Sequence, residues 1–312
     1  MKRRPVTTKR VLLTSLFVDT LDVLINITVA VITGSVVMLA EAMEGLADLA
    51  AVGMLLIGFK RSKKRSNRTY PFGYGKEQYF WALMSTFLII GVTASLSFYF
   101  GLHAFLNPEP VKNVTFAYVV LIFAVCTNGY ALQLSLHKLA GQRPWRHLPK
   151  LFFESSSVAP KTTIVLDAMG TLAALFGLTS LIIYGITDNA RFDGVGAMSI
   201  GVMLFVLALV LIFTTKGWVT GRSAPLETEQ LIREATLKSP EVQSVLDLRT
   251  MMLGSDKLLA NMEIHLQDDL TTDKIEKIID QIKRRVRKAV PDEVHVNVEP
   301  ETPPKKRIPK NT

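Results

Sequence analysis

Cysteine is nearly absent from this sequence, because Cys126 is the single one in 312 residues. One cysteine excludes an internal disulfide bond and any zinc site built on several thiolates. Cys126 lies within an apolar run, and we interpret it as a thiol packed in the core. The sequence also lacks a Gly-x-x-x-x-Gly-Lys-Ser/Thr phosphate-binding loop and a nucleophile–histidine–acid order. An ATP-driven pump and a membrane hydrolase therefore have no support, and no enzymatic activity is predicted.

Charged residues are scarce as well, at 20% of the chain against 49% hydrophobic residues. Six apolar runs of roughly 20 residues each are long enough to cross a hydrocarbon core of ~30 Å. They cover approximately residues 11–33, 36–59, 78–100, 116–136, 162–184 and 195–215. We therefore predict a membrane α-helical domain in residues 1–218, with six transmembrane helices in a lipid bilayer.

The net charge of +9 comes from basic residues that lie between the apolar runs and near the chain ends. The alternate loops hold only Lys112 and Arg191 as basic residues. The other basic clusters lie in residues 2–10, 60–68, 138–150 and 216–222. Because basic loops stay on the cytoplasmic side of a membrane, we predict that both termini are cytoplasmic and that nucleic acid is not a partner. The lack of a recognisable targeting segment favours a prokaryotic plasma membrane.

The pattern changes from Pro225 onward, where soluble elements replace the apolar runs. Alternating apolar and polar residues predict three strands, and helical periodicity predicts two helices. In chain order these are a helix over 228–237, strands over 242–253 and 258–267, a helix over 273–288 and a strand over 294–298. The α-β-β-α-β order predicts a cytoplasmic α+β ferredoxin-like domain in residues 219–300. Residues 301–312 form a basic tail that we expect to be disordered.

Three carboxylates interrupt the second apolar run. Glu41, Glu44 and Asp48 are spaced i, i+3 and i+7, so all three project from one face of a helix. One charged side chain near the bilayer centre costs roughly 2.5–3.5 kcal/mol on insertion scales. The stripe therefore favours a watery cavity that binds a cation or protons. The alternative is that the acids are protonated or pair with basic residues near helix ends.

Further carboxylates lie in the first and fifth apolar runs. They are Asp19 and Asp22 in the first run and Asp167, one helical turn before Thr171, in the fifth. No lysine or arginine lies inside runs one, two or five away from their ends, so pairing with basic residues is the weaker interpretation.

These features together resemble the cation diffusion facilitator family. The resemblance rests on six spans, a ferredoxin-like C-terminal domain, Gly34-Ser35-Val36 at the start of span two, and the stretch from Tyr70 to Leu83. It implies a secondary transporter that exports divalent metal in exchange for protons. In that family, span two carries an acid or histidine followed four residues later by aspartate, and span five carries a matching His-x-x-x-Asp.

The family pattern implies a primary metal site in this chain. Glu44 and Asp48 stand at the span-two positions, and Asp167 and Thr171 at the span-five positions. Glu41 is the alternative to Thr171 as the completing ligand. Glu41, Asp19 and Asp22 are otherwise accessory or proton-coupling acids. The chain departs from the family because its site contains no histidine.

The donor atoms leave the identity of the transported metal open. Carboxylate and hydroxyl oxygens suit hard ions such as Mn²⁺, Fe²⁺ or Mg²⁺, whereas Zn²⁺ also binds carboxylates and is favoured by the resemblance. Like-charge repulsion between close carboxylates supports proton exchange, since protons and metal compete for the same oxygens. The rival hypothesis is a membrane regulator or scaffold that keeps the fold and transports nothing, because the expected histidines are missing.

In the C-terminal domain, the strands over 258–267 and 294–298 each have an outward set of side chains. The resemblance implies that this sheet face forms homodimer contacts and binds regulatory metal. A solvated or dimer-facing sheet is our preferred interpretation. The candidates for a weak regulatory site are His265, His295 and Glu299.

Overall fold

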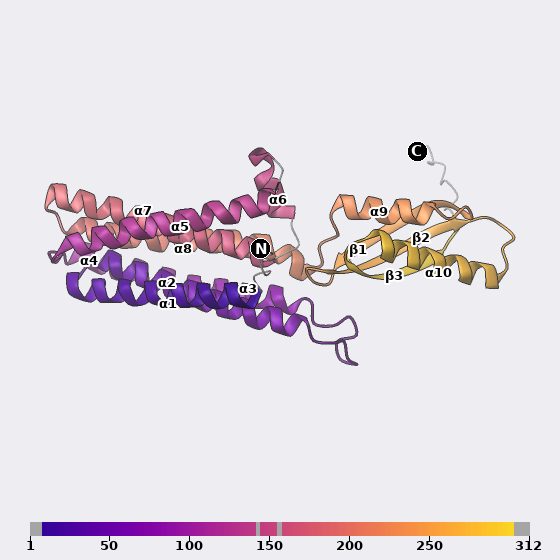
Figure 1. The fold of residues 1–312 in the computed structure, drawn as a ribbon, viewed down its shortest axis with the longest axis horizontal. Helices are drawn as coiled ribbons and strands as arrows, with labels where there is room; N and C mark the ends of the chain where they lie inside the picture. Colours follow the sequence, from indigo (N-terminus) through magenta and orange to yellow (C-terminus); the bar gives the residue numbers. More distant parts are fainter. Residues whose placement is uncertain (1–7, 142–143, 155–157, 303–312) are drawn as a thin grey trace, which may run out of the picture. The chain divides into compact units, whose positions relative to one another are not determined.

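The computed structural model describes residues 8–141, 144–154 and 158–302 of the chain. It divides into two compact units (Figure 1). One unit is helical and is built almost entirely from residues before 217. The other contains the residues from 217 onward and also takes in the loop of residues 62–76.

Long helices form the first unit at the positions where the sequence predicts spans. They are α1 (Thr8–Thr33), α2 (Val36–Ser62), α3 (Glu77–Leu88), α4 (Ser95–Leu106), α5 (Val114–Ala140), α7 (Val158–Thr187) and α8 (Arg191–Thr220). A π-helical segment, η1 (Ile89–Ala94), joins α3 to α4 as one continuous rod. Two short elements, η2 (Trp145–His147) and α6 (Leu148–Glu154), precede α7.

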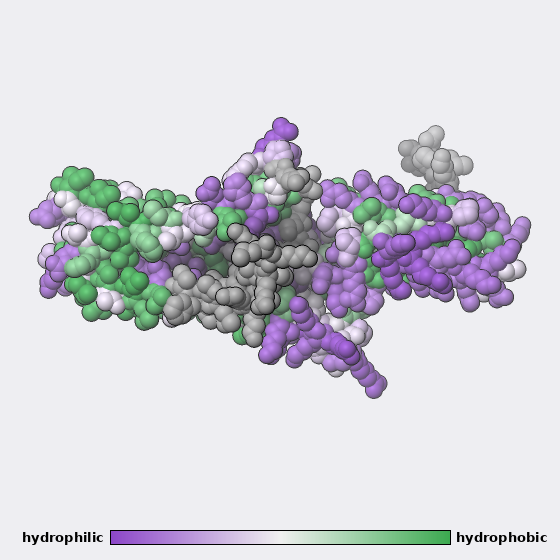
Figure 2. Space-filling view, viewed as in Figure 1, coloured by the Kyte–Doolittle hydropathy of each residue, from purple (hydrophilic) through white to green (hydrophobic). Residues whose placement is uncertain are grey.

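Five helical segments within the described ranges are long and apolar enough to cross a membrane. They are Val36–Ser62, Glu77–Leu106, Val114–Ala140, Pro160–Thr187 and Arg191–Thr220. Figure 2 shows that hydrophobic residues cover much of the visible surface of the helical unit, as expected for a surface that faces lipid. A helical membrane domain is therefore confirmed. The first predicted span forms the 26-residue helix α1, and its passage through the bilayer stays a prediction.

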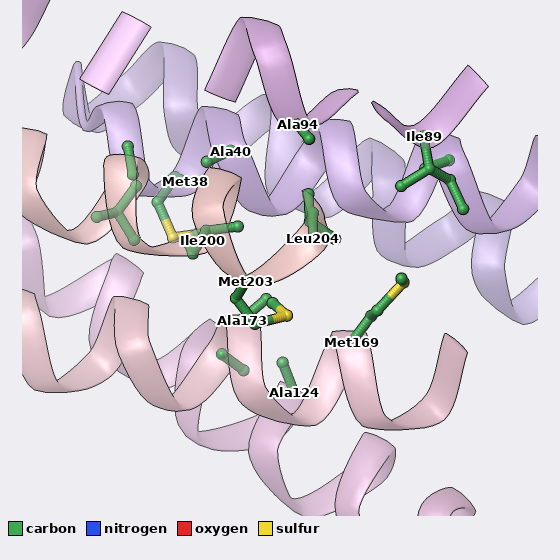
Figure 3. Packing of buried hydrophobic residues seen from close by; sticks show 14 of the residues in the cluster. Met38, Ala40, Ile89, Ala94, Ala124, Met169, Ala173, Ile200, Met203 and Leu204 are labelled. Atoms are coloured by element: carbon green, nitrogen blue, oxygen red, sulfur yellow. The ribbon is translucent and has the colours of Figure 1, made fainter. Parts of the chain in front are cut away.

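The apolar core of this unit lies between α2, α5, α7 and α8. Figure 3 shows Ala173 of α7 beside Met203 of α8, with Met169 farther along α7. On α5, the fully buried positions Ala117, Leu121 and Ala124 recur at helical spacing. Cys126 lies two residues beyond Ala124, about 200° around the helix, and it is exposed. The interpretation of Cys126 as a core thiol was therefore wrong, because the apolar run that holds it faces the core along one narrow stripe.

Helices α4 and α8 approach each other through glycine. A Cβ atom added at Gly194 would lie 2.6 Å from both the Gly101 carbonyl oxygen and the Phe105 nitrogen. A Cβ at Gly201 would lie 2.8 Å from the Ala94 carbonyl oxygen and the Phe98 nitrogen. Small residues are what allow membrane helices to bring their backbones this close.

The second unit is a three-stranded sheet with two helices. Its elements are α9 (Leu226–Leu237), β1 (Val242–Met252), β2 (Lys257–Leu266), α10 (Thr272–Ala289) and β3 (Glu293–Pro300). The strand order is β1-β2-β3, with an antiparallel β1–β2 pair and a parallel β2–β3 pair. The helices contact each other as well as the sheet (Figure 1), so they cover one face of it.

Alternation along β2 explains which face of the sheet is covered. Leu258, Ala260, Met262 and Ile264 are buried, and the apolar side of α10 supplies Ile278, Ile282 and Val286. The predicted α+β domain is thereby confirmed. The predicted disordered tail falls largely on residues 303–312, which lie outside the described residues.

Candidate functional site

The acidic residues of α1, Asp19 and Asp22, face the acidic stripe of α2, which consists of Glu41, Glu44 and Asp48. Val23 of α1 packs against Gly45 of α2 so closely that a Cβ at Gly45 would lie 2.7 Å from Val23 Cγ2. Asp22 and Glu44 are the sequence neighbours of these two residues. The Glu44 carboxylate is within electrostatic reach of Asp48 and Glu41 on its own helix, and of Asp22 and Asp19 on α1.

Burial makes this stripe chemically unusual. The side chains of Glu41 and Glu44 are only 2% and 4% exposed. One oxygen each of Asn26, Glu41, Glu44 and Asp48 is buried and accepts no hydrogen bond from any described residue. Asn26 uses its amide nitrogen to donate to Asp22 Oδ2 at 3.0 Å. The result is a set of buried oxygens without donors, and such groups are costly unless a cation or proton satisfies them.

Helix α7 contributes the opposite carboxylate. Asp167 interacts electrostatically with Asp48, and the predicted pairing of span two with span five as metal ligands stays a prediction. Thr171 donates its hydroxyl hydrogen to the Asp167 backbone carbonyl at 2.7 Å. This bond fixes the Thr171 rotamer and leaves its oxygen lone pairs as the only groups that could reach a metal.

A third helix, α5, contacts the site and was missed by sequence reasoning. Ser135 donates a hydrogen bond to Asp167 Oδ2 at 2.5 Å. Asn128 packs against α7, where a Cβ at Gly170 would lie 2.8 Å from its Nδ2 atom. Asn128 and Ser135 are seven residues apart, so they share one face of α5. That polar i, i+7 pair inside an apolar run is the sequence signal that would have predicted the contact of α5 with Asp167.

Glu41 occupies a different depth from Asp167. Its Oε1 atom lies 3.7 Å from the position of a Cβ at Gly177. Gly177 is ten residues beyond Asp167 on α7, which corresponds to about 15 Å along a helix. Glu41 therefore lies nearer to Asp22, which is the carboxylate within its electrostatic reach, than to Asp167. Of the two alternatives for completing the Asp167 site, this geometry favours Thr171.

Within the described residues, no three His, Cys, Asp or Glu side chains are arranged to hold one metal ion. Glu44, Asp48 and Asp167 are thus brought into one electrostatic cluster without forming a coordination shell. The primary site stays a prediction, and so do the accessory roles of Asp19, Asp22 and Glu41.

The regulatory candidates of the C-terminal domain do not converge within one chain. His295 pairs in register with Leu259, and Glu299 pairs with Glu263. Leu259 and His265 are six residues apart on β2, which is about 20 Å along a strand. His265 and Glu299 are therefore diagonal neighbours, whereas His295 lies far from both. A single site formed by all three residues has no support from this register.

His295 instead contacts the loop that connects α2 to α3. The Phe72 ring meets the His295 ring edge to face, with centroids 5.9 Å apart. A Cβ at Gly75 would lie 2.3 Å from the Leu253 carbonyl oxygen, so this loop is seated directly on the domain. Lys76 Nζ lies 3.4 Å from the Val219 carbonyl oxygen. His295 thus has a packing role in addition to any role in binding metal.

Comparison with known families identifies the architecture. A family model described as the cation efflux transmembrane domain matches residues 12–216, and another described as the cation efflux protein cytoplasmic domain matches residues 224–301. The chain belongs to the cation diffusion facilitator, or cation efflux, family. The predicted resemblance is thereby confirmed, and this is a family of integral membrane transporters rather than enzymes.

Relatives from this family are about one quarter identical to the chain over the residues that align. Proton-coupled zinc antiporter SLC30A9, mitochondrial, of Mus musculus is 25% identical over 265 residues, which is 84% of this chain and 47% of that protein. The chain thus spans about half the length of that relative. Cation-efflux pump FieF of Cronobacter sakazakii is 26% identical over 277 residues, covering 89% of this chain and 87% of that one.

Among solved structures, the MamB CTD magnetosome protein of Desulfamplus magnetovallimortis BW-1 is similar to the C-terminal region. It is 19% identical and covers 26% of this chain and 98% of that chain, with a TM-score of 0.24.

The Ser135 contact gives a prediction for this cation efflux protein. Replacing Ser135 with alanine removes the donor to Asp167, which is the predicted span-five metal ligand, and hydrogen-bond partners of metal ligands are typically worth about 10–100-fold in affinity or activity. We expect Ser135→Ala to raise the half-saturating metal concentration for transport in proteoliposomes by about tenfold or more. Ser135→Thr keeps a hydroxyl and should stay near the native value. Thr127→Ala, which removes an exposed hydroxyl from the same helix, is the control, and equal effects of Ser135→Ala and Thr127→Ala would contradict the assignment.

Proposed function

We propose that this protein is a secondary transporter that exports divalent metal cations from the cytoplasm in exchange for protons. The observation that carries the proposal is the set of buried oxygens without donors on Asn26, Glu41, Glu44 and Asp48. Such acceptor-only groups inside a membrane domain suit a cation and a proton that bind in turn. The domain division that goes with it is a transmembrane domain over 1–218, a cytoplasmic domain over 219–300 and a tail over 301–312.

The proposed primary site consists of Glu44 and Asp48 on α2 and Asp167 on α7, with Thr171 as the fourth ligand. Asp19, Asp22 and Glu41 provide the accessory acids that exchange protons with it. The electrostatic reach between Asp48 and Asp167 supports this arrangement. A small approach of α2 toward α7 would convert the electrostatic cluster into a coordination shell, and separation of the helices would release the metal.

Zinc, manganese and iron are the proposed substrates. A relative whose name specifies a proton-coupled zinc antiporter supports zinc. The all-oxygen donor set supports the harder ions Mn²⁺ and Fe²⁺, because imidazole and thiolate are the ligands that discriminate in favour of zinc.

We further propose a homodimer held by the cytoplasmic domain, with both termini in the cytoplasm and the protein in a prokaryotic plasma membrane. The match of residues 224–301 to the family's cytoplasmic domain supports the cytoplasmic assignment. The basic residues that follow α2 support the same orientation, since they include Lys60 and Arg61 in its last turn.

The test is metal-driven proton flux in proteoliposomes that contain the full-length protein and a pH-sensitive dye. Zn²⁺, Mn²⁺, Fe²⁺ and Mg²⁺ are applied separately against the same proton gradient. We expect a saturable, protein-dependent proton flux with at least one of Zn²⁺, Mn²⁺ and Fe²⁺. Lack of response to all four ions would overturn the transporter proposal and favour a non-transporting regulator or scaffold. That alternative gains weight from the absence, among described residues, of three acids already arranged around one ion.

A further inference from the structure

A buried carboxylate outside the proposed metal site joins α8 to the beginning of α2. Asp193 Oδ1 accepts a hydrogen bond from Ser35 Oγ at 2.6 Å and one from the Val37 backbone nitrogen at 3.1 Å. Its Oδ2 accepts from the Val36 backbone nitrogen at 2.7 Å. The side chain is 3% exposed. Asp193 therefore caps α2 from another helix, 157 residues away along the chain from Val36.

The cap has favourable chemistry. The first backbone N–H groups of a helix lack partners within that helix, and the positive end of the helix dipole attracts an anion. Charge-assisted hydrogen bonds of this kind are shorter and stronger than neutral ones. Three of them converge on a single Asp193 carboxylate, so the N-terminus of α2 is held to one point on α8.

Tight packing surrounds this cap. A Cβ at Gly196 of α8 would lie 2.5 Å from Val37 Cγ2 and 2.7 Å from Ser180 Cβ. The same valine approaches α7, because a Cβ at Gly177 would lie 2.7 Å from Val37 Cγ1. In the part of α2 before Asp48, the side chains are mostly buried, whereas over residues 48–56 most are only half-buried. The helix is therefore closed at its capped end and looser toward its C-terminal half.

The same end of the helical unit contains further polar links between segments. The Lys112 backbone nitrogen donates to the Thr33 carbonyl oxygen at 2.8 Å. The Val111 backbone nitrogen donates to the Tyr184 hydroxyl at 3.2 Å, and the Ser180 hydroxyl donates to the Phe192 carbonyl oxygen. None of these three links involves α2, the helix that carries Glu44 and Asp48, whereas Asp193 binds the start of that helix.

We propose that Asp193 is a positioning residue that latches the non-cytoplasmic end of α2 to α8 and so keeps the carboxylate stripe closed from that side. The proposal rests on the proposed transport function for its purpose and on the proposed membrane orientation for its side. Glu44 lies seven residues after Val37, or about 10 Å along the helix. Release of the cap lets the start of α2 move from α7 and α8 and admits water to the stripe.

Cysteine accessibility tests this latch without measuring transport. Cys126→Ser removes the single cysteine, and Ala40→Cys then places a reporter at a position that is 1% exposed and lies just past the capped end. A membrane-impermeant maleimide is added to either side of sealed vesicles. In the protein that keeps Asp193, labelling of the reporter cysteine should be slow from both sides. With Asp193→Ala, we expect labelling from the non-cytoplasmic side to accelerate about tenfold or more, because charge-assisted bonds are lost.

Two further variants separate a latch from general stability. Asp193→Asn keeps the shape and one acceptor oxygen, so its labelling rate should fall between those of aspartate and alanine. Tyr184→Phe removes a hydroxyl contact at the same end without touching α2 and should leave labelling unchanged. Equal acceleration by Tyr184→Phe, acceleration from both sides, or no acceleration in Asp193→Ala would overturn the latch.

Transport measurements then connect the latch to the proposed function. Asp193 contacts none of the proposed ligands, so Asp193→Ala should lower the maximal metal-driven proton flux and leave the half-saturating metal concentration near the native value. A raised half-saturating concentration with an unchanged maximal flux would contradict a positioning role. If the native protein transports nothing and the accessibility result still holds, then the latch stands and the proposed function fails.

Discussion

Alanine at Glu44 or at Asp48 is expected to reduce metal-driven proton flux by about 100-fold or more, since even outer-shell partners of a metal site are worth about 10–100-fold. Each change removes a carboxylate from the cluster on α2 that lies within electrostatic reach of Asp22 or Asp167. Loss of one anionic ligand weakens metal binding and also removes a group that carries protons, so metal transport and proton transport both decrease. The measurement is initial proton flux in proteoliposomes at several Zn²⁺ and Mn²⁺ concentrations.

Isosteric variants distinguish loss of charge from loss of packing. Glu44→Gln and Asp48→Asn keep the side-chain volume and remove the negative charge, so they should be nearly as inactive as the alanine variants. Glu109→Ala changes an exposed acid between α4 and α5 and serves as the matched control with native flux. Flux that persists unchanged in both Glu44→Ala and Asp48→Ala would refute the proposed site.

Most of the helices and strands could be predicted because their signals are local. An apolar run of sufficient length has few structural options in a membrane, since every backbone polar group must be satisfied within a helix. The strand that alternates from Leu258 to Leu266 and the amphipathic helix that buries Ile278 and Ile282 likewise depend on short-range periodicity. The predicted elements differ from the observed ones at their ends, where caps decide the last residues, whereas the short elements η2 and α6 before α7 were not predicted.

The parts of the site that the sequence did not predict depend on contacts between distant helices. Asp193 stands just before the sixth apolar run, and local pattern does not show that its carboxylate reaches the N-terminus of α2. Ser135 shares a helix face with Asn128, but only the packing of α5 against α7 determines that its hydroxyl meets Asp167. Periodicity placed His265 and His295 correctly on one sheet face, but their separation follows from the β2–β3 register. Spacing thus predicts which residues share a face, and tertiary packing determines which of them meet.

Valine at Gly194 is expected to prevent stable packing of the membrane unit. The added side chain would meet the backbone of α4 at Gly101 and Phe105, at distances that real Cβ atoms do not reach. Backbone atoms cannot turn aside as a flexible side chain can, so the whole contact between α4 and α8 must open. Overpacking typically costs about 1–3 kcal/mol even where side chains can adjust, and we expect about that much from Gly194→Ala and more from Gly194→Val.

A second glycine isolates this close approach from the general effect of replacing glycine in a helix. Gly53 lies within α2, and apart from the adjacent backbone of its own helix, a Cβ added there meets no atom of the described residues within 4 Å. Alanine is the better helix former by about 1 kcal/mol, so Gly53→Ala should be neutral or stabilising. The measurement is the thermal unfolding midpoint of the detergent-solubilised protein. A lower midpoint for Gly194→Ala alone would assign the loss of stability to the contact between α4 and α8. Equal midpoints for Gly194→Ala and Gly53→Ala would show that this contact can open without loss of stability.

Because Asp193 precedes Gly194 directly, opening the contact between α4 and α8 should also loosen the cap on α2. The rate at which Ala40→Cys is labelled should therefore rise in Gly194→Ala but not in Gly53→Ala.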